Sequence, residues 1–369
     1  MFQHHTLQFL CLYSILFLLF TAFVVQRNLE ARRLMTALPW LFAAAALAGA
    51  FAWGGPTALL IAALLSIMEV SLSFDNAVVN ATVLRRMDPI WQRRFLTWGI
   101  LIAVFGMRLI FPILIVAIAA GLGLLEVASM AVHDSKAYGK HLAEAHIGIA
   151  AFGGMFLLMV FLHFVCDEAK EVHWLWWIEQ RLARAGRLEA VEVAVALAVL
   201  LISQSLLPDG DRLTAMIAGV AGVATFVAVK GFAGLAGDAD AAGIAARSGA
   251  AGFVYLEVLD ASFSLDGVIG AFAMTTDIVV IMIGLAIGAM FVRTLTVHLV
   301  RKGTLEEFVY LEHGAHWGIG ALGIIMLVSM RVHVPEIVTG LVGVSLIGLS
   351  FLSSILHRRH KAAQPEQPT

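Results

Sequence analysis

Eleven apolar stretches, each about long enough to cross a lipid bilayer, dominate this sequence. The hydrocarbon core of a membrane is about 30 Å thick, so a helix that spans it needs about 20 mostly apolar residues. Only 14% of the residues are charged and 60% are hydrophobic, whereas soluble domains have about 25% charged and about 45–50% apolar residues. We therefore predict an all-α, polytopic membrane protein with about 11 transmembrane helices. The predicted spans are 6–26, 34–53, 57–84, 95–120, 146–165, 191–207, 213–236, 249–276, 278–300, 315–330 and 335–356.

Charge and cysteine content further restrict the class of protein to which this chain can belong. The net charge is −2, with 24 Lys+Arg against 26 Asp+Glu, which argues against nucleic acid as a partner because such proteins need a clustered basic face. The two cysteines, Cys11 and Cys166, lie far apart in the sequence and form no ligand or redox pattern, so we expect no disulfide scaffold. The first apolar stretch is expected to stay in the chain, because Arg27, Arg32 and Arg33 follow it instead of preceding it.

The basic residues also predict an orientation, since cytoplasmic loops carry the excess of Lys and Arg. With the N-terminus outside, 17 basic residues fall on the cytoplasmic side and 4 on the other side, and 3 lie within helices. The C-terminus is then cytoplasmic, and a bacterial inner membrane is the expected location. Residues 174–184 are predicted to form an interfacial amphipathic helix on the cytoplasmic face. The polar tail 357–369 is predicted to be disordered.

Two motifs occur twice in the same order. Residues 69–75 read acidic-x-Ser-x-Ser-apolar-Asp, and so do residues 260–266, 191 positions later. Residues 145–153 and 315–323 share Ala-His-x-Gly-Ile-x-Ala-x-Gly. The repeated spans are five apart, an odd number, so spans 3–5 and 8–10 must cross the membrane in opposite directions. Such inverted-topology repeats are typical of transporters that work by alternating access.

The repeat also divides the chain into predicted parts. These are a helix pair (1–56), the first repeat with the amphipathic helix (57–190), a connecting helix pair (191–248), the second repeat (249–330), and the last helix with its tail (331–369).

Several charged residues are predicted to lie inside spans. Each costs about 2.5–3.5 kcal/mol at a helix centre, so these side chains should face the interior of the bundle. Five acids and three bases leave two negative charges, which one divalent cation or two protons would neutralise. The alternative is a set of buried ion pairs that lock helices together, with Arg108 and Arg293 as charge partners and Lys230 reaching toward the membrane surface. The acids are Glu69, Asp75, Glu257, Asp260 and Asp266.

The polar residues of the repeated motif are the candidate metal ligands. Carboxylate, amide and hydroxyl oxygens suit Mg²⁺, Ca²⁺ or Mn²⁺, and the absence of a nearby thiol disfavours Cu(I) and a dedicated zinc site. The predicted metal ligands are Glu69, Asp75, Asn76, Asp260 and Asp266, and the further candidates are Ser73, Ser264 and Glu257.

The inversion predicts which ligands share a depth in the membrane. Glu69 should lie level with Asp266, and Asp75 level with Asp260, so the ligands form either one cage or two adjacent sites. On a straight helix Glu69 shares a stripe with Ser73 and Asn76, while Asp75 points elsewhere. Asp75 would then need a partner on another face or a locally unwound helix.

His146 and His316 are predicted to lie near opposite membrane faces. One interpretation is hydrogen bonding at helix ends. The other is a proton-coupled gate, because histidine titrates near neutral pH.

The repeated motif also carries a family resemblance. Residues 69–76 resemble the first signature, Glu-x-x-Leu-Ser-x-Asp-Asn, of the TerC (tellurium-resistance) integral membrane family, which belongs to the LysE-type transporter superfamily. Residues 260–267 are similar to its second signature, Asp-x-x-Phe-Ala-x-Asp-Ser, with Ser264 in place of alanine and Gly267 in place of serine. The resemblance covers roughly residues 57–330 and suggests an uncharacterised subgroup. It implies manganese export, and it also implies a link with tellurite resistance.

Three functions therefore remain open. The first is efflux of a divalent metal cation, with Mn²⁺ favoured, and the metal is then a substrate and not a cofactor. The second is transport of another solute, such as an oxyanion or an organic cation. The third is a membrane-embedded metalloenzyme, which is disfavoured because HExxH and HxxxH spacings are absent, so we expect no enzyme. The lipid bilayer and the metal ion are the expected partners, and the sequence leaves the oligomeric state open.

Overall fold

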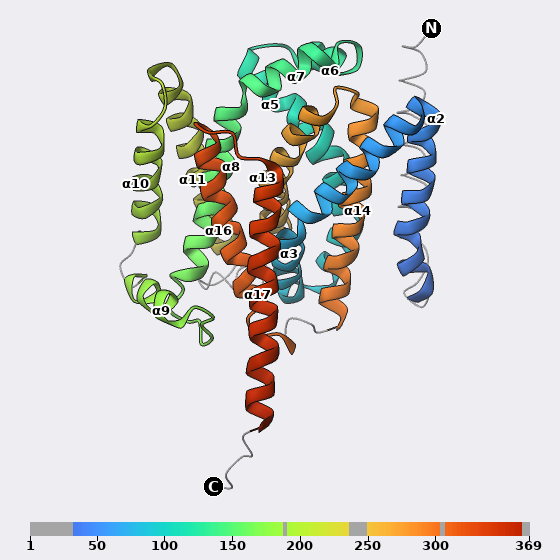
Figure 1. Cartoon of the computed structure of the whole chain (residues 1–369). Coiled ribbons are helices and arrows are strands. Elements are labelled where there is room, and N and C mark those ends of the chain that lie inside the picture. Colours follow the sequence, from blue (N-terminus) through green and yellow to red (C-terminus); the bar gives the residue numbers. More distant parts are fainter. Residues whose placement is uncertain (1–31, 187–189, 236–248, 303–306, 364–369) are drawn as a thin grey trace, which may run out of the picture.

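The computed structural model describes residues 32–186, 190–235, 249–302 and 307–363, and within them every regular element is a helix (Figure 1). This part of the chain has the all-α architecture of a polytopic membrane protein, as predicted. The elements are α2 (Arg32–Leu72), α3 (Phe74–Arg86), α4 (Pro89–Leu101), the π-helix η1 (Ile102–Ile110), α5 (Phe111–Ala120), α6 (Leu124–His133), α7 (Ser135–Glu144), α8 (His146–Val165), α9 (Trp176–Ala185), α10 (Val191–Ser205), α11 (Asp209–Leu235), α13 (Gly249–Met274), α14 (Ile278–Lys302), α16 (Leu311–Ser329) and α17 (Glu336–Ala363).

Seven helices of the described residues are long and apolar enough to cross a membrane. The predicted number was eleven, and the difference has identifiable causes. The spans predicted at 34–53 and 57–84 share α2, α10 has only 15 residues, and α13 carries three acids. The span predicted at 6–26 lies outside the described residues.

α2 consists of two legs that meet at a sharp turn. Gly54 and Gly55 leave the helical conformation, and Gly55 has φ 69° and ψ −157°, a combination that residues with a side chain rarely adopt. Figure 1 shows the first leg, residues 32–53, standing at the edge of the molecule. The second leg, residues 56–72, slants back into the bundle toward α3. The sequence predicted this separation of two helices.

The span predicted as one helix over 57–84 is broken in the structure. α2 ends at Leu72 and α3 begins at Phe74, and Ser73 between them has φ −104° and ψ 15°. No proline marks the break. It falls inside the repeated motif, so the motif residues on its two sides need not follow one straight helix.

Three other segments differ from the sequence prediction. The fourth span continues from α4 through nine residues of π-helix into α5, and π-helical turns are uncommon and often found at functional sites. The segment 121–145, for which no helix was predicted, contains α6 and α7. Residues 357–363 of the tail predicted to be disordered continue α17 as a regular helix.

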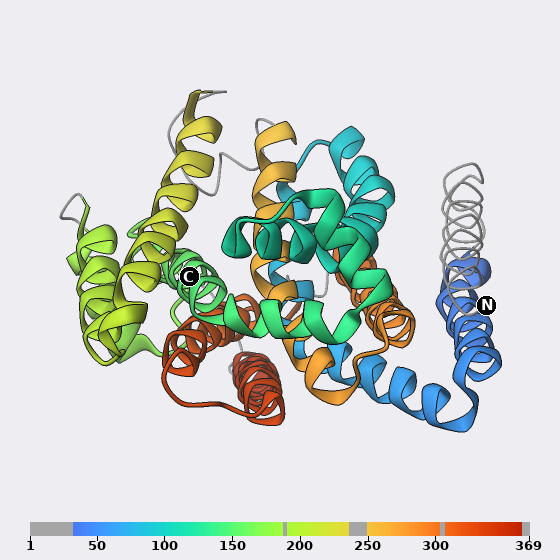
Figure 2. The ribbon, with the colours of Figure 1, turned by 90° about the horizontal axis from the view of Figure 1, so that it is seen from above.

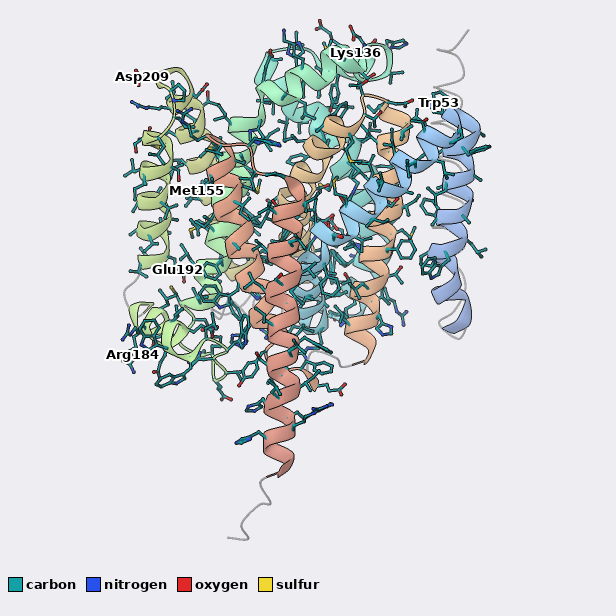
Figure 3. All side chains as sticks on the ribbon, viewed as in Figure 1. Trp53, Lys136, Met155, Arg184, Glu192 and Asp209 are labelled. Atoms are coloured by element: carbon teal, nitrogen blue, oxygen red, sulfur yellow. The ribbon has the colours of Figure 1, made fainter. Side chains whose placement is uncertain are left out.

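Among the described residues, segments predicted to be inside and outside lie at opposite ends of the bundle. Figure 3 shows Trp53, Lys136 and Asp209 toward one end and Arg184 toward the other. α9 and the last residues of α17 lie at the Arg184 end, which the basic residues assigned to the cytoplasm (Figure 1). At the opposite end Trp53 Nε1 donates to Asp277 Oδ2 over 3.0 Å and ties the turn of α2 to the start of α14.

Helix packing follows the internal repeat. A Cβ at Gly284 of α14 would lie 2.6 Å from Leu65 Cβ of α2, and a Cβ at Gly99 of α4 would lie 3.0 Å from Glu257 Oε1 of α13. Gly284 and Gly99 are 185 positions apart, and Glu257 and Leu65 are 192 apart, so the two contacts occupy almost equivalent places in the two repeats. Each motif helix therefore packs against the helix that follows the other motif.

α8 and α16, the helices that share the second motif, pack against each other at the centre of the molecule. A Cβ at Gly154 would lie 3.0 Å from the carbonyl oxygen of Gly323, and a Cβ at Gly323 equally close to the carbonyl oxygen of Gly154. The side chains of Met155 and Phe156 are fully buried beside this contact. Figure 2 shows α10 and α11 on one side of the central helices and the first leg of α2 on the other.

α9 is the amphipathic helix that the sequence predicted, and one carboxylate fastens it to the bundle. Glu179 is fully buried and accepts hydrogen bonds from His313 (2.9 Å), Trp317 (3.0 Å) and Lys170 (3.0 Å). Burial by itself raises the pKa of Glu179, but these donors and the positive charges outweigh it and hold the pKa well below its usual range. Glu179 thus stays ionised and joins α9 to α16.

Candidate functional site

Glu69 of α2 is the most completely bonded of the predicted ligands. Its side chain is 2% exposed, and Oε1 accepts a hydrogen bond from Ser73 Oγ over 2.9 Å. The same oxygen forms an ion pair with Arg108, which lies near the end of the π-helix η1 and is also buried. The ion pair that the charge count allowed is therefore present, and it neutralises Glu69 within the protein.

Two glycines make room for Glu69. A Cβ at Gly267 of α13 would lie 2.8 Å from Glu69 Oε2, and a Cβ at Gly288 of α14 would lie 2.4 Å from Glu69 Cβ. Real Cβ atoms do not approach other atoms so closely, so any side chain at either position would displace Glu69. The first contact places Glu69 at the level of residues 266 and 267, as the inverted repeat predicted.

Asp260 of α13 occupies the place in the second repeat that Glu69 occupies in the first. Its Oδ1 accepts a hydrogen bond from Asn76 Nδ2 over 2.6 Å, and its Oδ2 lies 3.9 Å from Arg293 Nη2. Arg293 is more strongly held elsewhere, since the same nitrogen donates to the carbonyl oxygen of Gly99 over 3.1 Å. Its guanidinium carbon also lies 4.0 Å from the centre of the Phe95 ring.

These contacts are related by the repeat. Arg108 and Arg293 are 185 positions apart, and Glu69 and Asp260 are 191 apart, so each arginine faces the first acid of its own repeat. Asn76 and Gly267 are also 191 apart, and each contacts the first acid of the other repeat.

The two motif segments form facing polar stripes with opposite directions. Glu69 meets Gly267 and Asn76 meets Asp260, so residue numbers rise along α2–α3 while they fall along α13. This register places Asn80 level with Glu257. The facing stripes comprise Glu69, Ser73, Asn76 and Asn80 on one side and Gly267, Ser264, Asp260 and Glu257 on the other.

The Asp260 half of the facing stripes consists of Asn76, Asn80, Glu257, Asp260 and Ser264. Most side-chain oxygen atoms in this half have no hydrogen-bond partner in the described structure. Each side chain concerned is at most 7% exposed. A buried polar atom without a partner costs about 1–3 kcal/mol, and more when it is charged, so this arrangement calls for a cation or for protons. The oxygen atoms are Asn76 Oδ1, Asn80 Oδ1, Glu257 Oε1 and Oε2, Asp260 Oδ2 and Ser264 Oγ.

Asn80 was not among the predicted ligands. It follows Asn76 by four residues, which is one turn further along the same face of α3, and its side chain is 1% exposed. Continuing the stripe of Glu69, Ser73 and Asn76 by one turn would have identified it.

One predicted ligand, Asp75, is not brought into the facing stripes. Asp75 Oδ1 accepts from the backbone N–H of Asn76, and its Oδ2 would lie 3.3 Å from a Cβ at Gly318 of α16 and 3.6 Å from one at Gly343 of α17. Asp75 thus faces another pair of helices in spite of the break at Ser73. The side chain of Asp266 lies outside the described part of the structure.

The described residues contain no group of three or more His, Cys, Asp or Glu residues arranged as a metal site. Among the buried oxygens without partners, those of Glu257 and Asp260 belong to carboxylates, and the others belong to two amides and a hydroxyl. Any cation held here would thus depend on asparagine as well as on carboxylate oxygen.

The predicted gate histidines make local hydrogen bonds. His146 Nε2 lies 3.4 Å from Ser329 Oγ, and His316 Nδ1 lies 2.9 Å from the carbonyl oxygen of Glu312. His316 also stacks on Phe164 with the ring centres 3.7 Å apart. These contacts fit the interpretation as helix-end hydrogen bonding, and the gate remains a prediction.

Lys230 is not part of the facing stripes. Its Nζ lies 3.2 Å from His163 Nδ1, and His163 in turn contacts Glu192 at 3.1 Å. Lys230 therefore belongs to a separate charged group on α8, α10 and α11 and does not balance the acids of the motif.

No curated protein and no solved structure matches the chain. Residues 74–361 match the family described as "Protein of unknown function (DUF475)". The matched range contains α3, α13 and both arginines that face the motif acids. It covers far more than half of the sequence, and the chain belongs to this DUF475 family.

Proposed function

We propose that this protein is a membrane transporter that moves a hard divalent cation by alternating access. The single observation that carries the proposal is the group of buried oxygen atoms without partners on the facing stripes. These oxygens come from carboxylates, amides and a hydroxyl, which are the ligand types of Mg²⁺, Ca²⁺ and Mn²⁺. A bound cation would remove the cost of leaving them unsatisfied.

The repeat supports a carrier in preference to a fixed binding site. Inverted repeats allow two halves of a protein to exchange conformations, which opens a central site to each side of the membrane in turn. In this chain the two motifs face each other, and each arginine contacts the first acid of its own repeat. The resemblance of residues 69–76 to the TerC family favours Mn²⁺ as the cation and efflux as the direction.

A second candidate, an oxyanion transporter, has an observation of its own. Arg108 Nε and Arg293 Nη1 are buried and have no hydrogen-bond partner in the described structure. Guanidinium N–H groups recognise oxyanions such as tellurite or phosphate. The carboxylates around both arginines would repel an anion, which is why we rank this candidate second.

Whole-cell metal content tests the proposal. Elemental analysis would compare wild-type cells, a deletion strain, and deletion strains carrying the wild-type gene or the Asp260→Asn variant. We expect manganese to rise on deletion, to fall when the wild-type gene is restored, and to stay high with the variant. Unchanged levels of every divalent metal would contradict cation transport, and a change in tellurite sensitivity alone would support the oxyanion.

We further propose that the protein lies in a bacterial inner membrane with its N-terminus outside. Single cysteines in a variant without native cysteines would test this, with Lys136→Cys at one end of the bundle and Arg184→Cys at the other (Figure 3). An impermeant thiol reagent should label position 136 in intact spheroplasts and position 184 only after lysis. The reverse pattern would invert the topology.

A further inference from the structure

The two halves of the facing stripes have equivalent acids and arginines, but they differ in their other residues and in their bonding. Asn76, Asn80 and Glu257 of the Asp260 half correspond in the repeat to Gly267, Ala271 and Ser66. In the Glu69 half, Arg108 is bonded directly to the carboxylate, and Ser73 donates to the same oxygen. In the Asp260 half, the equivalent Arg293 lies 3.9 Å from the carboxylate and donates to the carbonyl oxygen of Gly99. Arg108 is thus hydrogen-bonded to its acid, whereas Arg293 is hydrogen-bonded to the backbone beside its acid.

The two acids of the Asp260 half have no hydrogen bond to Arg293. Glu257 lies one helical turn before Asp260, and a Cβ at Gly99 would lie 3.0 Å from Glu257 Oε1 and 3.6 Å from Arg293 Nη1. A single guanidinium group therefore serves two carboxylates, and it is hydrogen-bonded to neither. Both oxygens of Glu257 and one oxygen of Asp260 have no partner.

Two amide oxygens complete this half. Asn76 uses its Nδ2 to donate to Asp260, which leaves its Oδ1 in the same place without a partner. Asn80 Oδ1 is also without a partner, and the register of the facing stripes places it level with Glu257. Two carboxylates and two amide oxygens, all buried, make a donor set of the kind that holds Mn²⁺, Mg²⁺ or Ca²⁺.

We propose that Glu257, Asp260, Asn76 and Asn80 form the cation site, and that the Glu69 half holds no cation because Arg108 already neutralises its carboxylate. This inference rests on the proposed function and specifies where the ion binds.

The test is Mn²⁺ binding to the purified full-length protein in lipid nanodiscs, measured by the loss of the electron paramagnetic resonance signal of free Mn²⁺. Glu257→Gln should weaken binding about tenfold or more, because it removes a charged ligand. Asn80→Asp should tighten binding, because it adds one. Glu179→Gln is the matched control, since Glu179 is an equally buried carboxylate on α9, and it should leave binding unchanged.

The Glu69 half needs a separate variant that keeps its charge balanced. The double variant Glu69→Gln with Arg108→Gln should bind Mn²⁺ like the wild type, because the Glu69 half contributes no ligand to the site. Equal binding by wild type and Glu257→Gln, with no gain in Asn80→Asp, would overturn the site while leaving cation transport standing. An equal loss of binding in the Glu69/Arg108 variant would also overturn it. A wild-type protein that binds none of Mn²⁺, Mg²⁺ and Ca²⁺ would overturn the proposed function itself. Because Asn80→Asp tests for a gain, the inference stays falsifiable even where Glu257→Gln fails to fold.

Discussion

The carboxylate of Glu69 occupies the space that a side chain at position 267 would need, since a Cβ there would lie 2.8 Å from Oε2. We expect Gly267→Ala to lower the free energy of unfolding by about 1–3 kcal/mol, the usual cost of overpacking, and to reduce transport. Fluorescence-monitored melting in detergent and flux in proteoliposomes would measure the two effects. Gly348→Ala is the control, because nothing lies within 4 Å of a Cβ at that position of α17. Equal behaviour of the two variants would show that Glu69 does not lie against α13.

The ion pair of Glu69 and Arg108 leads to a second prediction at the scale of single residues. Glu69→Gln leaves the buried guanidinium group without its counter-charge, which should cost about 3–5 kcal/mol. The double variant with Arg108→Gln should recover much of that loss. A double-mutant cycle on unfolding in mixed micelles measures the coupling, and additive effects of the two substitutions would contradict a direct pair.

Residue types and spacing predicted much of the candidate site. Intramembrane charge is costly, so the acids of the motif could be placed in the interior, and Arg108 and Arg293 could be named as their partners. Helix periodicity also indicated that Asp75 points away from the stripe of Glu69, and in the structure it faces Gly318 and Gly343 on other helices. The break at Ser73 could not be predicted, because no proline marks it.

At the scale of elements, the attachment of α9 depends on Glu179. Replacing Glu179 with glutamine removes the charge that His313 and Lys170 neutralise and should cost about 1–3 kcal/mol. We expect faster hydrogen exchange in α9 of Glu179→Gln and unchanged exchange in α8. Unchanged protection of α9 would show that Glu179 does not hold the helix.

The same carboxylate sets the pH range of this attachment. A carboxyl group whose pKa is depressed by folding contributes stability above its unfolded pKa, near 4.5 for Glu179, and that stability is lost as the pH falls through the lower folded pKa. Because Glu179 is ionised at both pH 5.5 and pH 7.5, its contribution to the hydrogen-exchange protection of α9 should be the same at the two pH values.

The positions of the long helices could be predicted closely from the apolar stretches, but the irregularities within helices could not. α8 spans the predicted residues 146–165, because this apolar run has the length of about 20 residues that a spanning helix needs. The π-helix η1 could not be foreseen, since Ile102–Ile110 has no proline and only one glycine. α6 and α7 are short and lie at one end of the bundle, where length and hydropathy constrain the chain less (Figure 1).

At the scale of the whole molecule, the internal repeat explains the arrangement of the contacts. Motifs 191 residues apart predicted two halves of opposite direction, and the contacts of Glu69 with Gly267 and of Asn76 with Asp260 show that the motif segments run antiparallel. The sequence could not predict that Arg108 bonds its acid while Arg293 bonds the carbonyl oxygen of Gly99, because the two arginines occupy equivalent positions in the repeat.

Flux of Mn²⁺ into proteoliposomes containing only this protein tests the central claim most directly. An ion-sensitive dye inside the vesicles would compare wild type with Asp260→Asn, and Gly348→Ala would serve as the control. We predict saturable uptake by wild type and by the control and none by Asp260→Asn, because Asp260 joins both motifs at the centre of the facing stripes. Equal uptake by wild type and Asp260→Asn, or no uptake above that of empty vesicles by the wild type, would contradict the claim.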